Sequence, residues 1–333
     1  EVPSAVCSKR PILELAVKML NPKDDEFVIN GYYDRNHRIP GAMKHVWQTI
    51  DELRSDLSEK SRSDMKIRYA HTYIKGIDIN PDLAKVAKMH MILYDDGHTG
   101  IFAENSLRPI PEIRESALRA KAGDVREEFF DLLFTNPPFG TKGRITNKIY
   151  LQQFKLGYKW KKDKRTGRYV GTQDFSSGRV PEILFIERCL SFLRDGGRMA
   201  IVLPDGILTN ITLEYVREFI RSKARILAVI SLPQKTFLPH GTGSKTSVVF
   251  LQKIDEETLK ELKNQDYPIF MAICEKIGYD IRDRTIFKKD ELGQYIDDQG
   301  NVVENKENAA VDTDIPEIIE AFKKFKEKHK LGF

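Results

Sequence analysis

The sequence has 333 residues, with 54 Lys and Arg against 49 Asp and Glu and a formal net charge of +5. A single large core is feasible at this length, and so mild a charge excess permits nucleic-acid binding without requiring it. The three cysteines lack paired spacing, which argues against a disulfide framework or a zinc site and fits a reducing cytoplasm. No apolar run is long enough for a bilayer span, and the start at Glu1 without a signal peptide leaves open that the chain is part of a longer protein.

Apolar runs that are typical of strands alternate with amphipathic helical stretches, which is the pattern of a parallel sheet covered by helices. Asn80 and Pro81 begin one helix, and Pro181 begins another that continues to Leu193. We therefore predict a doubly wound α/β fold with a seven-stranded, mainly parallel sheet. The expected strands are Glu26–Asn30, Tyr73–Ile79, Gly100–Asn105, Asp131–Asn136, Arg198–Pro204, Ile226–Leu232 and Ser247–Lys253.

The sequence becomes more polar after the last of these strands. One further apolar strand is expected at Ile269–Ile273, and an amphipathic helix at Pro316–Lys328 is expected to be capped by Asp314. We read these elements as additions to the core. The predicted division is a core domain at 1–254, with a basic insertion at about 155–179, and a small C-terminal appendage with a closing helix at 255–333.

A short polar and aromatic segment follows the fourth expected strand. Asn136 offers a side-chain acceptor, Pro137 and Pro138 give a stiff extended backbone with a free carbonyl, and Phe139 offers a stacking face. Two acceptors and an aromatic ring suit a flat base that bears an exocyclic amine. The alternative reading is a strand end stopped by prolines, with a buried phenylalanine.

Two other strand ends carry polar side chains. Asp78, followed by Ile79, stands where a carboxylate accepts both hydroxyls of a ribose, although a helix cap explains the same residue. Asn105 and Ser106 follow the third strand and could face the base of the same nucleotide, or they could form a solvated turn.

Taken together, these motifs resemble the N-6 adenine DNA methyltransferases, in particular the modification subunits of type I restriction-modification systems. The resemblance extends over nearly the whole chain and implies a sheet of the type found in S-adenosylmethionine-dependent methyltransferases. The segments that carry it are Lys18–Pro22, Gly76–Ile79, Asn105–Leu107, Asn136–Gly140, Gly196–Gly206 and Thr246–Leu251.

The resemblance implies a function: a site-specific DNA adenine N6-methyltransferase core that takes its methyl group from S-adenosylmethionine, without a metal. Asn136 and the carbonyl of Pro137 would hold the amine of an adenine flipped out of double-stranded DNA, next to Pro138, while Phe139 stacks on the base. It also implies a specificity subunit or target-recognition domain, and a restriction subunit as a further partner. The implied cofactor-binding residues are Asp78, Ile79, Asn105, Ser106, Asn30 and Gly31.

One segment departs from the family pattern. The family has a glycine-rich Asp-Pro-x-x-Gly-x-Gly-Gly-Phe loop after the first strand, whereas this chain has Asn30–Ile39 with bulky side chains. Their β-carbons would crowd the methionine part of the cofactor, so we expect impaired cofactor binding. The alternative function is therefore a catalytically impaired relative that serves as a DNA-binding or assembly component. A lesser alternative is a protein glutamine methyltransferase, because those enzymes use a similar tetrapeptide that usually ends in Tyr.

The stretch from Lys155 to Arg168 interleaves basic residues with Tyr158 and Trp160, and Tyr169 follows it. This composition suits a loop that contacts phosphates beside a flipped base. A solvated insertion explains the same composition.

Overall fold

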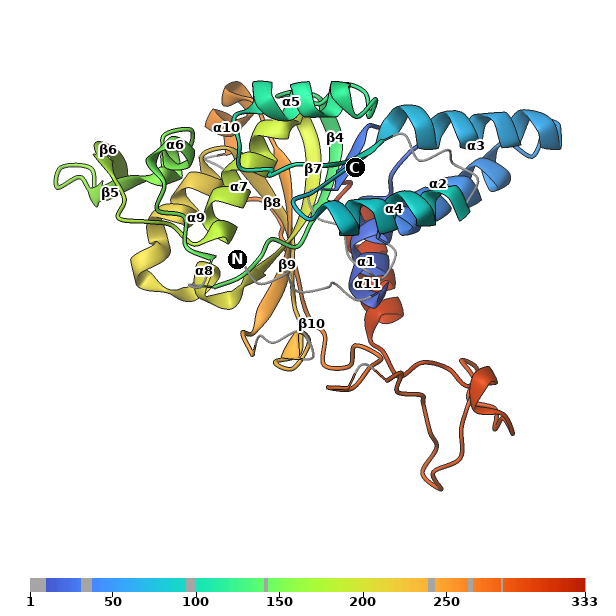
Figure 1. The fold of residues 1–333 in the computed structure, drawn as a ribbon. Coiled ribbons are helices and arrows are strands. Elements are labelled where there is room, and N and C mark those ends of the chain that lie inside the picture. The colour runs from blue at the N-terminus through green and yellow to red at the C-terminus, as the bar shows by residue number, and fades with distance from the viewer. Residues whose placement is uncertain are drawn as a thin grey trace.

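The computed structural model describes most of the chain, and its centre is one large sheet (Figure 1). The described residues are 10–30, 38–93, 100–140, 143–238, 243–262, 266–282 and 284–332. Within them, the sheet has eight strands in the order β10-β8-β9-β7-β4-β1-β2-β3. The strands are β1 (Val28–Asn30), β2 (Ile74–Asp78), β3 (Ile101–Ala103), β4 (Phe130–Thr135), β7 (Leu193–Pro204), β8 (Ala224–Ser231), β9 (Thr246–Lys253) and β10 (Phe270–Ile273).

Neighbouring strands of this sheet are parallel except at β9, which is antiparallel to both β7 and β8. The predicted doubly wound α/β class and mainly parallel sheet are confirmed, but the number of strands is eight among the described residues and not seven. The additional strand is β10, which we expected outside the core sheet. It pairs with β8 from Phe270 opposite Ala228 to Ile273 opposite Ser231. The proposed division of the chain at residue 254 stays a prediction.

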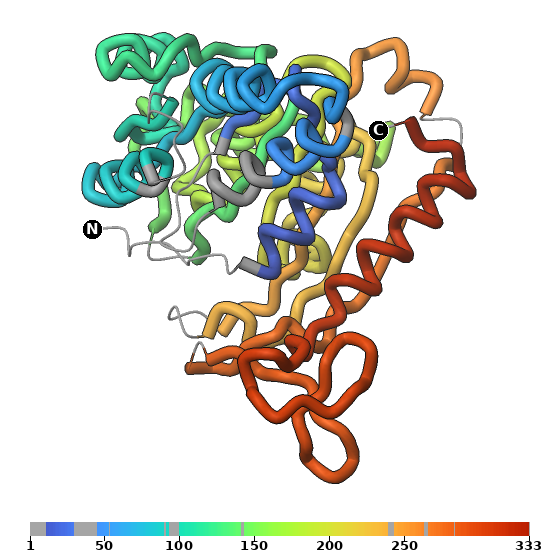
Figure 2. The backbone as a smooth tube through the Cα atoms, turned by 90° about the vertical axis from the view of Figure 1, so that its right-hand side faces the viewer, coloured from blue at the N-terminus to red at the C-terminus, as the bar shows by residue number. Residues whose placement is uncertain are grey.

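Helices cover both faces of the sheet, and each face has its own buried apolar cluster. One cluster joins the sheet to α1, α2, α4 and α11, and the other joins it to α5, α7 and α9 (Figure 1). The chain returns at its end to the first face, where α11 contacts α1 (Figure 2). The helices are α1 (Arg10–Leu20), α2 (Arg38–Leu53), α3 (Glu59–Tyr73), α4 (Pro81–Leu93), α5 (Ile110–Arg119), α6 (Lys148–Leu151), α7 (Pro181–Phe192), α8 (Asp205–Thr209), α9 (Glu214–Arg221), α10 (Glu256–Leu262) and α11 (Ile315–Lys328).

The starts of two helices test the capping predictions. The side-chain oxygen of Asn80 accepts hydrogen bonds from the amides of Asp82 and Leu83, at 2.9 and 3.4 Å, so the predicted cap of α4 is confirmed. Asp314 stands at the predicted N-cap position of α11, but the expected side-chain cap is wrong, because its carboxylate makes no capping bond to the helix. It accepts instead from the amides of Glu275 and Lys276, at 2.7 and 2.8 Å, and so ties the chain after β10 to the start of α11.

The basic stretch after β4 contains a two-stranded antiparallel hairpin of β5 (Tyr158–Lys162) and β6 (Tyr169–Phe175). This hairpin projects from the body of the molecule on the side of α9 (Figure 1). At its base, Ile145 and Arg179 form an antiparallel bridge, with N–O distances of 2.7 and 2.9 Å. The insertion therefore leaves the core and returns to it at one point.

The loops between β10 and α11 extend away from the sheet (Figures 1 and 2). They are joined by isolated bridges, including one between Ile277 and Thr313 near the start of α11. In the described part of the chain, no helix combines the length and the apolarity that a membrane crossing needs.

Candidate active site

The predicted site residues gather at one edge of the sheet because β1, β2, β3 and β4 are parallel. Asn30 and Asp78 end β1 and β2, whereas Asn105 and Asn136 follow the ends of β3 and β4. The strand order reverses between β1 and β4, since the connections from β1 run outward to β2 and β3 and the next strand lies on the other side of β1. Ligands of doubly wound sheets bind at such a reversal. Gly31 lies outside the described residues.

The segment after β4 is largely enclosed. The β4 run is buried on both faces of the sheet, and Asn136 that follows it has 0% of its surface exposed. Pro137 is also buried, whereas Pro138 and Phe139 are half-buried. The Phe139 ring meets the buried Phe237 edge to face, with centroids 5.9 Å apart and planes at 72°. The stacking role of Phe139 stays a prediction, and its ring is neither fully buried nor fully open to solvent.

A buried carboxyl group contacts the end of this segment. Gly140 has a φ of +96°, which favours glycine, and its amide donates to Oε1 of Glu182 at 3.3 Å. Glu182 lies in the first turn of α7 and is 4% exposed, and its Oε2 has no hydrogen-bond partner among the described residues. Burial raises the pKa of Glu182 above its ordinary value. Sequence reasoning missed this residue, because it lies inside an apolar helical run.

The end of β2 combines a buried acid with an exposed apolar side chain. Oδ1 of Asp78 accepts from the amide of Asn80 at 2.7 Å, and the Asp78 carbonyl accepts from the amide of Glu104 at 2.9 Å. Ile79 follows with 58% of its surface exposed. The Asp78 carboxylate thus has a local turn role, while Asn80 supplies the helix cap. Ribose binding by Asp78 stays a prediction.

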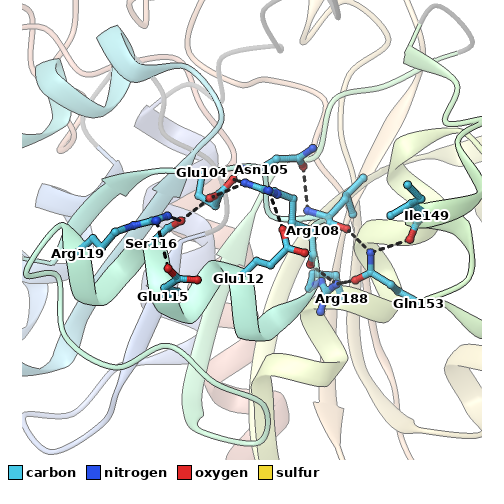
Figure 3. A network of polar contacts seen from close by, with 11 residues as sticks. Glu104, Asn105, Arg108, Glu112, Glu115, Ser116, Arg119, Ile149, Gln153 and Arg188 are labelled. Atoms are coloured by element: carbon cyan, nitrogen blue, oxygen red, sulfur yellow. Dashed lines mark hydrogen bonds and ion pairs between the residues drawn. The ribbon is translucent and has the colours of Figure 1, made fainter.

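The turn after β3 is fixed by the polar network shown in Figure 3. The Glu104 carboxylate accepts from the amide of Asn105 at 2.8 Å and from the hydroxyl of Ser116 at 2.6 Å, and it pairs with Arg108 at 3.3 Å. Burial raises the pKa of Glu104, but the hydrogen bonds from Ser116, Asn105 and Arg108 outweigh it, so the pKa lies below its ordinary value. Glu104 is therefore held as a carboxylate.

The two polar residues predicted in this turn have different surroundings. Oδ1 of Asn105 accepts from the amide of Leu107 at 3.0 Å, which is a local turn bond, and Ser106 is buried. The guanidinium of Arg188 on α7 donates to the carbonyl of Arg108 at 2.8 Å and to Gln153 at 3.2 Å (Figure 3). The turn is thus braced against α7. Contact of Asn105 and Ser106 with a nucleotide stays a prediction.

A further acidic residue, Asp205, joins two loops at the same edge. Asp205 follows β7, which is parallel to β4, and its Oδ1 accepts from the hydroxyl of Ser247 at 2.8 Å. Its amide donates to the carbonyl of Lys245 at 2.9 Å. Asp205, in the Gly196–Gly206 segment, therefore fixes the start of β9 beside the end of β7.

Two predictions about ligands are not tested by these contacts. Residues 31–37 lie outside the described residues, so the replaced cofactor loop is represented only by Asn30 and by the start of α2. In the described ranges, no three His, Cys, Asp or Glu side chains gather closely enough to hold a metal ion.

Comparison with known proteins gives one family match across the chain. The model of the N-6 DNA methylase family matches residues 9–332. In sequence, the chain is 27% identical over 128 residues to the type I restriction enzyme EcoEI methylase subunit of Escherichia coli. That alignment covers 38% of this chain and 22% of the subunit.

Solved structures share the fold at low sequence identity. The M protein of the type I restriction enzyme EcoKI superposes with a TM-score of 0.53 and 21% identity, over 75% of this chain and 44% of that protein. The type ISP restriction-modification enzyme LlaGI, in complex with a DNA substrate mimic, gives a TM-score of 0.54 and 12% identity, over 90% of this chain and 29% of that enzyme. The chain thus spans less than half the length of each of these three relatives.

Proposed function

The chain belongs to the N-6 DNA methylase family, and from this membership and the geometry of the sheet edge we propose that it transfers a methyl group from S-adenosylmethionine to the N6 amine of adenine in double-stranded DNA. The observation that carries the proposal is the position of Asn136, at the end of β4 and beside the strand-order reversal. We further propose that the chain is the modification component of a restriction-modification system.

In this proposal, Asn136 and the backbone of Pro137 position the amine. The side-chain oxygen of Asn136 and the carbonyl of Pro137 each accept one N–H of the flipped adenine, so its nitrogen lone pair faces the methyl donor. Phe139 stacks on the base, and such stacking contributes about 1–3 kcal/mol against the few kcal/mol that flipping costs. The edge-to-face contact with Phe237 supports this role, because it fixes the plane of the Phe139 ring.

The cofactor would supply an activated methyl group, and the residues at the ends of β2 and β3 fit a nucleoside. Asp78 offers a carboxylate for ribose hydroxyls, and the exposed side chain of Ile79 offers an apolar surface for a base. Asn105 and Ser106 would border the same base, and Asn30 and Gly31 would face the methionine part. We also propose that the bulky side chains of Asn30–Ile39 weaken this last contact.

The replaced loop favours a second candidate function. A copy that binds S-adenosylmethionine poorly would serve as a DNA-binding or assembly component and not as an enzyme. In either case we propose that sequence recognition comes from a specificity subunit or a target-recognition domain, with a restriction subunit as a further partner. The support for these partners is the description of the EcoEI relative as the methylase subunit, and of the EcoKI relative as the M protein, of a type I restriction enzyme.

Two measurements on the purified chain separate these functions. Calorimetric titration with S-adenosylmethionine measures cofactor binding, and mass spectrometry of digested DNA measures N6-methyladenine after incubation with a specificity partner. Cofactor binding together with N6-methyladenine supports the enzyme. Absence of both cofactor binding and N6-methyladenine supports the second function, and methylation of glutamine in a protein substrate, detected by mass spectrometry of that protein, would contradict both.

A further inference from the structure

The β5–β6 hairpin has two chemically different faces. Along β5, Tyr158 and Trp160 are half-buried, whereas Lys159 and Lys161 between and after them are exposed. Alternate residues of a strand point to opposite faces, so the two lysines share the outer face, about 7 Å apart along the strand. The hairpin therefore turns its aromatic side chains toward the protein and its charges toward solvent.

The inner face fixes the hairpin to α9. Trp160 stacks on Tyr215 with ring centroids 5.9 Å apart, and it meets Phe219 edge to face at 6.3 Å. The amide of Tyr169 donates to Oε2 of Glu218 at 2.8 Å. A two-stranded hairpin alone is marginally stable in water, so these contacts are what give the projecting hairpin a fixed direction.

The outer face of β5 and the turn that follows it carry exposed cations that form no salt bridge to a described residue. No ion pair joins Lys159, Lys161, Lys164, Arg165 or Arg168 to a carboxylate in the described ranges, and all five are exposed. The nearby Asp163 is engaged in the turn itself, where its Oδ1 accepts from the amides of Arg165 and Thr166 at 3.0 and 2.8 Å.

The excess positive charge of the chain is concentrated in the insertion that contains the hairpin. Residues 143–179 contain ten Lys and Arg against two Asp, although the whole chain has a net charge of only +5. The remainder of the sequence is therefore net acidic. A concentrated field of one sign attracts a polyanion, whereas evenly mixed charges do not.

The hairpin is joined directly to the candidate active site. The chain runs from Gly140 into the insertion, and it returns through Arg179 to Glu182, the residue that contacts Gly140. The Arg179 guanidinium donates to the carbonyls of Leu156 and Tyr158, at 2.7 Å each, and so braces the base of the hairpin. A ligand that binds the outer face therefore has a fixed position relative to the end of β4.

We propose that the outer face of the β5–β6 hairpin is a clamp for the phosphate backbone of duplex DNA on one flank of the adenine held at Asn136. This inference rests on the proposed function, and it adds which surface of this chain holds the duplex. Side chains that contact phosphates fix position and give affinity but carry no sequence information. The clamp therefore supplies affinity that depends on salt and not on the base sequence.

The test compares two charge-reversal variants of the full chain. The clamp variant is Lys159→Glu, Lys161→Glu and Lys164→Glu, and the control is Lys60→Glu, Lys323→Glu and Lys328→Glu, on exposed positions of α3 and α11. Both change the net charge equally. Fluorescence anisotropy measures the affinity for labelled duplexes of several unrelated sequences at a series of salt concentrations. Thermal unfolding and a neutral variant, with Gln at the three clamp positions, check that the fold is kept.

The clamp variant should bind every duplex at least about tenfold more weakly at low salt, and its log–log salt slope should fall by up to about 3, since each lost phosphate contact changes it by about 0.9. The Gln variant should show a smaller change of the same sign, and the control should bind like the parent. Equal losses in clamp and control variants, or unchanged affinity in the clamp variant, would overturn the proposal. Unchanged affinity in the clamp variant would indicate that this face binds an acidic protein surface and not DNA.

The outcome is independent of the methyl-transfer proposal, because anisotropy needs no cofactor. A chain that loses DNA affinity only in the clamp variant, yet neither binds S-adenosylmethionine nor methylates DNA, supports the clamp and contradicts the enzyme. A chain that methylates adenine with unchanged affinity in the clamp variant supports the enzyme and contradicts the clamp.

Discussion

Substitutions of Glu182 should separate its role as an acceptor from its role as a buried acid. Its Oε1 accepts from the amide of Gly140, and its side chain is almost fully enclosed. Glu182→Gln keeps a carbonyl oxygen of the same shape, whereas Glu182→Ala leaves the Gly140 amide without that acceptor. Gly140 is only half-buried, and a typical hydrogen bond contributes about 0.5–1.5 kcal/mol net, so the Ala variant should be less stable than the Gln variant by about this amount.

The pH dependence has a definite sign. Burial raises the pKa of Glu182 in the folded chain, so the folded state takes up this proton more readily than the unfolded state. The resulting stabilisation is fully present below the unfolded pKa and is lost as the pH rises through the raised folded pKa. Gln carries no proton to lose. The stability of the parent relative to Glu182→Gln should therefore fall between acidic and neutral pH.

Urea unfolding of the three proteins at several pH values measures both effects, and the comparison with Gln cancels the titration of all other groups. If Glu182 positions the segment that ends at Gly140, methyl transfer should be kept in the Gln variant and reduced in the Ala variant. The reasoning is refuted if the two variants are equally stable, or if the difference between the parent and the Gln variant is the same at every pH.

Three other predictions concern the site itself. Asn136→Ala should abolish N6-methyladenine formation, measured by mass spectrometry, and should lower the melting temperature because the residue is buried; retained methylation would contradict its role. Phe139→Ala should weaken binding to a duplex with a mismatched adenine more than to a matched one, and equal losses would contradict stacking. Replacing Asn30–Ile39 with the family's glycine-rich loop should strengthen S-adenosylmethionine binding in calorimetry, and unchanged affinity would show that the native loop is no obstacle.

The central strands of the sheet could be predicted from the sequence because they are continuous apolar runs. β4 and most of β9 are buried on both faces, which leaves little ambiguity about their type. β10 was harder to assign, because it is an edge strand with Met271 and Ile273 exposed at 73% and 71%. Nothing in a short run of four residues shows whether it joins the main sheet or a separate unit.

The local rule for helix caps failed at Asp314, whose carboxylate makes tertiary hydrogen bonds instead. Asp314 precedes a Pro-Glu pair and reads as a helix cap, but its carboxylate bonds two amides nearly forty residues earlier in the chain. Asn80 obeyed the same rule because no distant donor competes for its side-chain oxygen among the described residues. A capping motif thus predicts that a polar side chain has a donor to satisfy, and the fold decides which donor.

In the candidate site, too, some features follow from the sequence and others depend on tertiary contacts. That Asp78 and Asn136 lie at the same edge could be predicted, because β2 and β4 both run parallel to β1, which lies between them. The contact between Glu182 and Gly140 could not, because it joins positions 42 residues apart and has no local pattern. The sequence predicted a loop in the basic and aromatic insertion and did not predict the antiparallel hairpin. The aromatic inner face of that hairpin depends on α9, which supplies Tyr215 and Phe219.

The closed base of the insertion separates the candidate active site from the proposed phosphate-binding face of the hairpin. Since Ile145 pairs with Arg179 and Gly140 contacts Glu182, the ends of the insertion are held together whatever lies between them. The entropic cost of closing a loop grows only slowly with its length, so residues between these points can change with little strain on the core. We therefore expect that substitutions on the proposed phosphate-binding face leave the side chains proposed to hold the base in place.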